Sequence, residues 1–262
     1  MENSGQKKPV VLVFSGHDPS GAAGIHADIE SIALSGCHCA SVITATTAQN
    51  TARFEQIYPQ APAHFKQQIE TLLSDIKVDA CKIGLIGSSA IAAIIAETLP
   101  ALGNIPIVLD PVIAAGTGTE VADKALQALM IERLFPSVTL LTPNAKEARE
   151  WTDTENIQAS VIKLFQYGCE NILITGADEN TARVSNSLFC RDQAPVSFEW
   201  ERLADTFHGS GCTLSAHTAG LLAKGMDMKS AVARAQHFTW QSLRQGRKLG
   251  KGQTHPDRFF SA

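Results

Sequence analysis

The chain has 262 residues, of which 44% are hydrophobic and 18% are charged, a composition typical of a globular protein with a large core. Its formal net charge of −4 provides no long-range attraction to nucleic acid or to an anionic membrane, so neither is expected as a partner. The apolar run after the polar N-terminus extends only from Val10 to Phe14, whereas a membrane helix needs about 20 apolar residues. We therefore expect a cytoplasmic protein whose cysteines stay reduced.

Short apolar runs rich in Val, Ile and Leu alternate with longer amphipathic segments, which favours strands and helices in alternation. We expect strands at residues 10–15, 40–47, 54–58, 80–83, 105–109, 138–141, 171–175, 188–190 and 196–200. We expect helices at residues 24–35, 64–76, 90–99, 122–134, 145–151, 159–167, 211–224 and 230–245. This alternation predicts an α/β three-layer sandwich, with a mainly parallel central sheet and helices on both faces.

The domain organisation is predicted to be simple. Residues 1–9 are expected to form a flexible N-terminal arm and residues 10–262 a single domain, because no repeat or linker interrupts the pattern. In doubly wound sheets, ligands bind outside the carboxyl ends of the strands. Functional residues are therefore expected in the loops that follow the strands, and the glycines of residues 116–119 make that loop a candidate flap.

The strongest local signal is the sequence His-Gly-Ser-Gly-Cys at residues 208–212, which opens an apolar helix. Gly209 and Gly211 let the backbone turn tightly beside a ligand, and the helix start presents N–H groups to an anion. The thiol of Cys212 is expected to have a lowered pKa at this position and to act as a base or nucleophile. A glycine-rich helix start with an inert buried cysteine explains the same residues equally well.

A second glycine-rich loop, at residues 15–24, follows the first predicted strand. It lacks the Gly-Lys-Ser/Thr ending of a Walker A motif, so it is either another kind of ligand loop or an ordinary turn. Asp28 lies about one helical turn beyond Gly24. From there its carboxylate can point back to the loop and accept a hydrogen bond from a ligand.

Acidic groups follow two further strands. Asp110 comes directly after the apolar run 105–109, where a carboxylate can help to hold Mg²⁺, although an Asp-Pro pair is also a common turn. Asn144 precedes a predicted helix and Glu147 is its third residue, a spacing that also suits a helix cap. Together the loops supply acidic groups for Mg²⁺, backbone donors for a phosphoryl group and a base, which phosphoryl transfer requires.

Six stretches of the chain carry a resemblance to a known family. They are residues 15–28 (SGHDPSGAAGIHAD), 41–51 (SVITATTAQNT), 82–85 (KIGL), 109–112 (LDPV), 141–148 (LTPNAKEA) and 208–216 (HGSGCTLSA). In this order they resemble the bacterial hydroxymethylpyrimidine/phosphomethylpyrimidine kinases of thiamin biosynthesis, in the ribokinase superfamily. The resemblance implies a ribokinase-like fold and two ATP-dependent phosphorylations of hydroxymethylpyrimidine, first to the monophosphate and then to the diphosphate.

The resemblance also implies a substrate pocket made by residues from four of the matching stretches. Its members would be Gln49, Gly16, Asp28, Leu85 and Val112. The amide of the glutamine would hydrogen-bond the aminopyrimidine, and the aliphatic side chains would supply apolar contacts.

Further roles follow from the same resemblance for the phosphate side of the site. Cys212 stands where sugar kinases of the superfamily use Asp, which makes it the catalytic base. The anion hole around it would be formed by Gly209, Ser210 and Gly211. Mg²⁺ and the ATP phosphates would be organised by Glu147, Asp110, Asn144 and Thr175. Relatives often pair, so the resemblance also implies a homodimer.

Two stretches depart from the family pattern. Where the family usually has a lysine in Lys-Gly-Gly, this chain has Thr175, Gly176 and Ala177, which removes a cation near the nucleotide phosphates and leaves nucleotide preference open. Residues 250–260 (GKGQTHPDRFF) lack the Gly-Pro tail that is familiar in the family.

Two alternatives remain open from the sequence. A pyridoxal kinase of the same superfamily would share the Gly-Ser-Gly-Cys loop and the layout of the pocket. A non-catalytic pyrimidine-binding protein would keep the fold, and the absent lysine favours this reading. The retention of Glu147, Asp110 and Cys212 favours catalysis.

Overall fold

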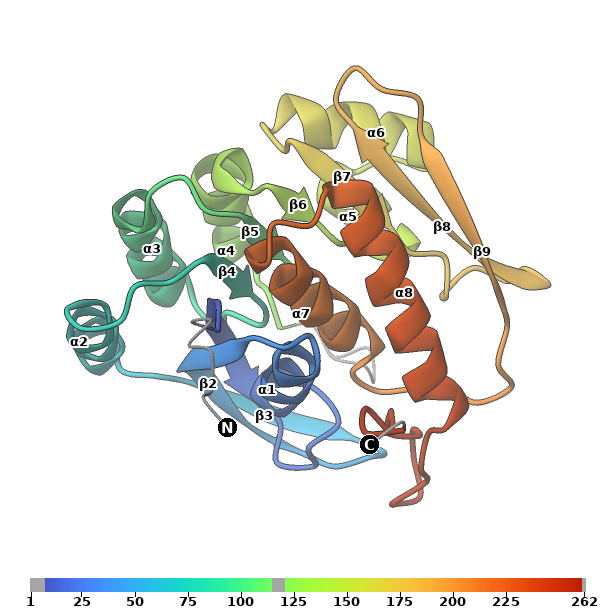
Figure 1. The fold of residues 1–262 in the computed structure, drawn as a ribbon, viewed down its shortest axis with the longest axis horizontal. Coiled ribbons are helices and arrows are strands. Elements are labelled where there is room, and N and C mark those ends of the chain that lie inside the picture. Colours follow the sequence, from blue (N-terminus) through green and yellow to red (C-terminus); the bar gives the residue numbers. More distant parts are fainter. Residues whose placement is uncertain (1–7, 115–120, 261–262) are drawn as a thin grey trace, which may run out of the picture.

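A nine-stranded sheet forms the centre of the computed structural model, which describes residues 8–114 and 121–260 (Figure 1). The strands are β1 (Val10–His17), β2 (His38–Gln49), β3 (Phe54–Pro59), β4 (Ala80–Ile83), β5 (Ile107–Leu109), β6 (Leu140–Leu141), β7 (Asn171–Ile174), β8 (Arg183–Cys190) and β9 (Val196–Glu201). They are ordered β3-β2-β1-β4-β5-β6-β7-β8-β9. The six strands from β2 to β7 in this order are parallel, and β3, β8 and β9 pair antiparallel at the two ends.

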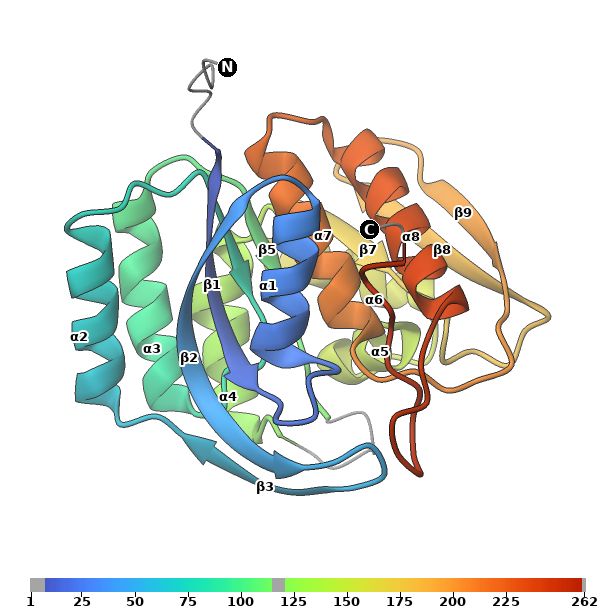
Figure 2. The ribbon, with the colours of Figure 1, turned by 60° about the horizontal axis from the view of Figure 1, so that its bottom comes forward.

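Helices cover both faces of the sheet (Figures 1 and 2). One face carries α1 (Gly24–Leu34), α7 (Ser210–Ala223) and α8 (Met228–Arg244). The other carries α2 (Pro62–Leu73), α3 (Ser89–Thr98), α4 (Lys124–Leu129), α5 (Ala145–Thr152) and α6 (Ile157–Gln166). The predicted three-layer α/β sandwich with a mainly parallel sheet is therefore confirmed.

Strand β1 shows why a continuous apolar run becomes a central strand. Successive side chains of a strand point to opposite faces, so Leu12 and Phe14 pack into the core under α2 to α6. Val11 and Val13 pack into the second core, under α1, α7 and α8. Because both faces of the strand are buried, its sequence is continuously apolar and does not alternate between apolar and polar residues, as is typical of parallel sheets.

Two elements differ from the sequence prediction. The helix expected over residues 122–134 is broken, since α4 gives way to a π-helical turn at Met130–Leu134 and a 3₁₀ turn at Phe135–Ser137. Strand β8 begins at Arg183 rather than near residue 188. Its polar residue Asn186 is buried because the side chain accepts from the Gly176 backbone N–H at 3.0 Å and donates to the Gln236 side chain at 2.8 Å.

Two sequence predictions concern other segments. The candidate flap at residues 116–119 lies outside the described residues. Among the helices that the structure describes, none combines the length and the apolar character needed to cross a membrane.

The chain after α8 returns to the body of the protein. In Figure 2 this dark red segment turns below α8 and runs back in front of α7. Backbone bonds attach it to distant parts of the sequence, since the N–H of Gln253 donates to Thr51 in the β2–β3 loop at 2.8 Å. The N–H of Thr254 donates to Thr206, ahead of α7, at 2.9 Å. The segment therefore links the loop of the β2–β3 hairpin to the start of α7.

Candidate active site

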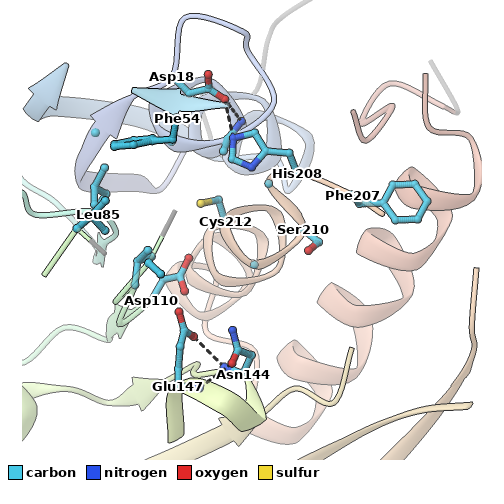
Figure 3. Close-up of a pocket in the computed structure, with 18 of the residues that line it drawn as sticks. Asp18, Phe54, Leu85, Asp110, Asn144, Glu147, Phe207, His208, Ser210 and Cys212 are labelled. Carbon is cyan, nitrogen blue, oxygen red and sulfur yellow. Dashed lines mark hydrogen bonds and ion pairs between the residues drawn. The ribbon is translucent and has the colours of Figure 1, made fainter. Parts of the chain in front are cut away.

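One cavity lies where the carboxyl ends of the parallel strands meet the start of α7 (Figure 3). Among its lining residues are Gly16, Gln49, Leu85, Asp110, Val112, Asn144, Glu147, Thr175, Gly209, Ser210, Gly211 and Cys212. They come from loops and strand ends that are far apart in sequence, and the order of the strands brings them together. All but one of the predicted site residues therefore face the same space.

Asp28 is the exception. It is fully buried in α1, does not line the cavity, and its Oδ1 lies 2.8 Å from Nζ of Lys82, which is also fully buried. Burial acts to lower the pKa of Lys82, but the charges of Asp28, Cys212 and Asp110, with the hydrogen bond to Asp28, together outweigh it and raise that pKa above its ordinary value. The prediction that Asp28 reaches a ligand is not supported by this geometry, because the helix directs its carboxylate to strand β4 instead.

Cys212 lies in the first turn of α7, with its sulfur directed into the cavity (Figure 3). Its predicted low pKa is wrong: burial raises the pKa of the thiol to about 12. The ammonium of Lys82 opposes this rise, whereas the carboxylates of Asp110 and Asp28 add to it. The helix start is not enough to favour the thiolate, since loss of hydration and two nearby carboxylates outweigh it.

The loop before α7 is fixed to the loop after β1. Nε2 of His208 lies 3.1 Å from Oδ2 of the buried Asp18 (Figure 3). Burial acts to raise the pKa of Asp18, but hydrogen bonds from His208 and Ser20 outweigh it and hold that pKa at about 2. The carboxylate also accepts from the backbone N–H of Ala23 at 3.0 Å. The ionised Asp18 therefore joins the two glycine-rich loops.

Gly209 makes this approach possible. Its φ is +86°, and a Cβ at this position would lie 1.9 Å from the carbonyl oxygen of Ala22. Both the left-handed backbone and the close approach require glycine. The predicted need for a tight turn at this residue is thus explained by contact with the first loop.

We expect Gly209→Ala to lower the free energy of unfolding by about 2 kcal/mol or more, because left-handed strain of about 1–2 kcal/mol is joined by a backbone clash. Gly225→Ala is the matched control, since its φ is +80° but nothing lies within 4 Å of the added Cβ. Urea unfolding of both variants measures the difference. Equal losses for the two variants would show that the contact with Ala22 is unimportant.

Two carboxylates face each other in the cavity, and the nearer one, Asp110, is hydrogen-bonded to Cys212. The carboxyl groups of Asp110 and Glu147 point toward one another in Figure 3. Burial raises the pKa of Glu147 to about 8, and the charge of Asp110 contributes to this rise. Burial also raises the pKa of Asp110, with Lys82 opposing and Asp28 adding. Ionising both Asp110 and Glu147 therefore costs free energy unless a bound cation balances their charge.

Glu147 has a second role as part of a helix cap. Its Oε2 accepts from the backbone N–H of Asn144 at 3.0 Å, and Oδ1 of Asn144 accepts from the N–H of Glu147 at 2.8 Å. This is a capping box at the start of α5. The predicted cap is confirmed, and it coexists with exposure of both residues to the cavity.

The carboxylate pair suits a hard divalent cation. No group of three or more His, Cys, Asp or Glu side chains arranged for a metal occurs in residues 8–114 and 121–260. Mg²⁺ is usually held by one or two carboxylates, with water and substrate phosphates completing its shell. Asp110 and Glu147 fit that pattern.

The opposite end of the cavity is less charged. Nε2 of Gln49 donates to Oγ1 of Thr47 at 2.8 Å, and that hydroxyl donates to the carbonyl of His17 at 2.9 Å. Leu85 packs on Gly16, where a Cβ would lie 2.7 Å from Cδ2 of the leucine. This end therefore combines one fixed amide with an apolar wall, which suits a small flat ring.

Sequence reasoning missed several residues of the site. Phe54, the first residue of β3, and Phe207, in the loop before α7, both line the cavity, and no local pattern marks them. Asp18, His208 and Lys82 lie inside the matching stretches, but their pairing requires the fold. A charged residue in the middle of an apolar strand was the available signal for Lys82, because buried charges need a partner.

Comparison with known proteins agrees with this geometry. A profile of the phosphomethylpyrimidine kinase family matches residues 18–257. The hydroxymethylpyrimidine/phosphomethylpyrimidine kinase of Mycobacterium tuberculosis is 36% identical, over 95% of this chain and 93% of its own. The pyridoxal kinase of Staphylococcus aureus in complex with ADP is 26% identical and superposes with a TM-score of 0.88, over 96% of this chain and 94% of that one.

Some relatives are longer than this chain. The thiamine biosynthesis bifunctional protein ThiED of Geobacter sulfurreducens is 33% identical over 96% of this chain, which covers 52% of that protein. The chain thus spans about half the length of the first curated relatives that it matches. The family profile nevertheless covers most of the chain, and the matched region includes every predicted site residue except Gly16. The chain belongs to the phosphomethylpyrimidine kinase family.

Proposed function

We propose that the protein transfers the γ-phosphoryl group of ATP to 4-amino-5-hydroxymethyl-2-methylpyrimidine and then phosphorylates the monophosphate to the diphosphate. The observation that supports this most directly is the shared cavity, in which the amide of Gln49 and the apolar wall beside it open onto the carboxylate pair and the loop of Cys212. Relatives with both activities in their names support the substrate.

The residues divide the reaction between them. Gln49 and the wall of Leu85 and Val112 orient the ring so that its alcohol lies beside Cys212. In its thiolate form, Cys212 accepts the proton of the alcohol as the alcohol oxygen bonds to the γ-phosphorus and the bond to ADP breaks. The backbone N–H groups at the start of α7 stabilise the charge of the moving group.

Asp110 and Glu147 would hold Mg²⁺, with Asn144 and Thr175 beside the phosphates. A bound Mg²⁺ supplies charge neutralisation for the phosphates of ATP. Neutralising Asp110 also removes one of the charges that raise the pKa of Cys212. The base is therefore expected to act only in the fully loaded site.

The direct test is a phosphorus NMR time course with ATP, Mg²⁺ and the hydroxymethylpyrimidine. Monophosphate followed by diphosphate is expected. Consumption of no ATP, with calorimetric binding of the pyrimidine retained, would instead establish a non-catalytic binding protein.

Pyridoxal is the second candidate substrate. The similarity to the Staphylococcus aureus pyridoxal kinase over nearly the whole chain favours testing it. Turnover of pyridoxal and of hydroxymethylpyrimidine should be measured side by side at equal ATP. Faster phosphorylation of pyridoxal would replace the pyrimidine as the assigned substrate.

We expect Mg²⁺ affinity to rise with pH by about tenfold per pH unit below 8 and to level off above it, because one proton must leave Glu147 before the cation binds. The pKa of about 8 for that carboxyl sets the window. Calorimetry in two buffers of different ionisation enthalpy measures the released proton. Glu150→Gln, an exposed change on the same helix, is the control, and a pH-independent affinity in the unaltered protein would contradict the assignment.

Three wider properties belong to the same proposal. We propose a cytoplasmic protein, supported by six free cysteines, and a single domain over residues 10–262 after the arm 1–9, supported by one continuous sheet. We also propose a homodimer, supported by the half-exposed Tyr58 on the edge strand β3. Sedimentation equilibrium tests the dimer, and a monomer at micromolar concentration would exclude it.

A further inference from the structure

The C-terminal segment after α8 contains a buried arginine. The side chain of Arg258 is 2% exposed, although several of its neighbours in the segment are exposed. Burying a guanidinium is costly unless it is paired and hydrogen-bonded. The partners of Arg258 therefore show what this segment holds in place.

The guanidinium contacts three different elements. Nη1 lies 2.9 Å from Oε2 of Glu30 in α1, and Nε donates to Oγ1 of Thr213 in α7 at 2.9 Å. Nη2 donates to the carbonyl of Ala22, in the loop after β1. The planar fork of an arginine is suited to such fixed, divergent contacts.

Two of these partners also touch Gly209. The hydroxyl of Thr213 donates to the carbonyl of Gly209 at 2.8 Å. The carbonyl of Ala22 lies against the Cα of Gly209, where a Cβ would come within 1.9 Å. Arg258 is thus hydrogen-bonded to both groups that contact Gly209, the Thr213 hydroxyl and the Ala22 carbonyl, and these groups set the position of the Gly-Ser-Gly-Cys loop.

We propose that Arg258 is a positioning residue for phosphoryl transfer, acting through Thr213 and Ala22 to hold the loop of Cys212 against the loop after β1. This inference rests on the proposed kinase function. Arg258 does not line the cavity, so its loss should leave substrate and ATP binding largely intact. The chemical step depends on the alignment of donors and base, which tolerates little displacement.

The test compares Arg258→Met with Arg258→Lys. Met keeps the length of the side chain but removes the donors, and we expect kcat to fall about 100-fold with little change in either KM. Lys should restore part of the loss. Arg247→Met is the matched control because Arg247 lies in the same segment and pairs with Asp257 at 2.6 Å, but its side chain is 70% exposed.

A second pair of variants covers the case in which Arg258→Met does not fold. Thr213→Ser keeps the hydroxyl that links Arg258 to Gly209, and Thr213→Val removes it at nearly constant volume. We expect the serine variant to retain turnover and the valine variant to lose it. Equal turnover of the two would overturn the proposed link.

Cys212 provides a readout that is independent of catalysis. The rate at which iodoacetamide alkylates Cys212, followed by peptide mass spectrometry with Cys190 as the internal reference, should change several-fold in Arg258→Met and not in Arg247→Met. If the unaltered protein phosphorylates neither candidate substrate, the proposed function fails while this comparison still decides the inference. Unchanged alkylation in a folded Arg258→Met protein, or a kcat equal to that of Arg247→Met, would overturn it.

Discussion

Cys212→Ala is expected to lower kcat by roughly 10²–10⁴-fold, the usual contribution of a general base, with little change in the KM for ATP. The thiol faces the cavity at the start of α7, where its sulfur can reach an alcohol but is not needed to hold the nucleotide. Rates of ADP release, measured over a range of ATP concentrations, separate the two parameters.

The raised pKa of about 12 for this thiol adds a pH signature. Because the neutral thiol predominates at neutral pH, the thiolate fraction and hence kcat should increase with pH through the neutral and mildly alkaline range. Cys190→Ala is the control, since that half-buried thiol lies in β8 and does not line the cavity. A fully active Cys212→Ala enzyme would remove the cysteine from the mechanism.

Lys82→Met is expected to lower the free energy of unfolding by about 3–5 kcal/mol, because it leaves the carboxylate of Asp28 buried without its partner. Both side chains are fully buried and 2.8 Å apart. Urea unfolding measures the loss. The double variant Lys82→Met with Asp28→Asn should regain most of it, since no uncompensated charge then remains in the core.

An exposed lysine serves as the comparison for this prediction. Lys66→Met removes a pair with Glu70 at 3.9 Å whose side chains are 57% and 64% exposed, and such surface pairs contribute little. A Lys82→Met protein as stable as Lys66→Met would mean that Asp28 is protonated in the core. A double variant no more stable than Lys82→Met would mean that lost packing, rather than charge, dominates.

Local sequence patterns predicted the fold correctly for strands that are buried on both faces. The run from Val10 to Phe14 is apolar because both faces of β1 are covered, and such runs are recognisable without the structure. The predicted length of strand β8 was too short because its buried polar residue Asn186 does not look like a strand residue in the sequence. Its side chain forms hydrogen bonds with Gly176 and Gln236, which lie in other segments of the chain. Hydrogen bonds of this kind are invisible in a single segment.

The sequence predicted which residues line the site more completely than it predicted their pKa values and ion pairs. Its loops carry recognisable motifs, so Cys212, Asp110 and Glu147 could be placed at one edge of the sheet. The pKa of Cys212 depends on burial and on the carboxylates of Asp110 and Asp28. The expectation of a low pKa at a helix N-terminus takes account of neither. The role of Asp28 failed for the same reason, because its partner lies 54 positions further along the chain, at Lys82.

The capping box at α5 has a consequence for how substitutions there should be interpreted. One oxygen of Glu147 anchors the first turn of a helix while the carboxyl group also faces Asp110. Truncation to alanine would therefore confound two effects, a frayed helix and a weakened cation site. The isosteric amide of Glu147→Gln keeps an acceptor for the backbone while discarding the charge, which makes glutamine the more interpretable probe of this position.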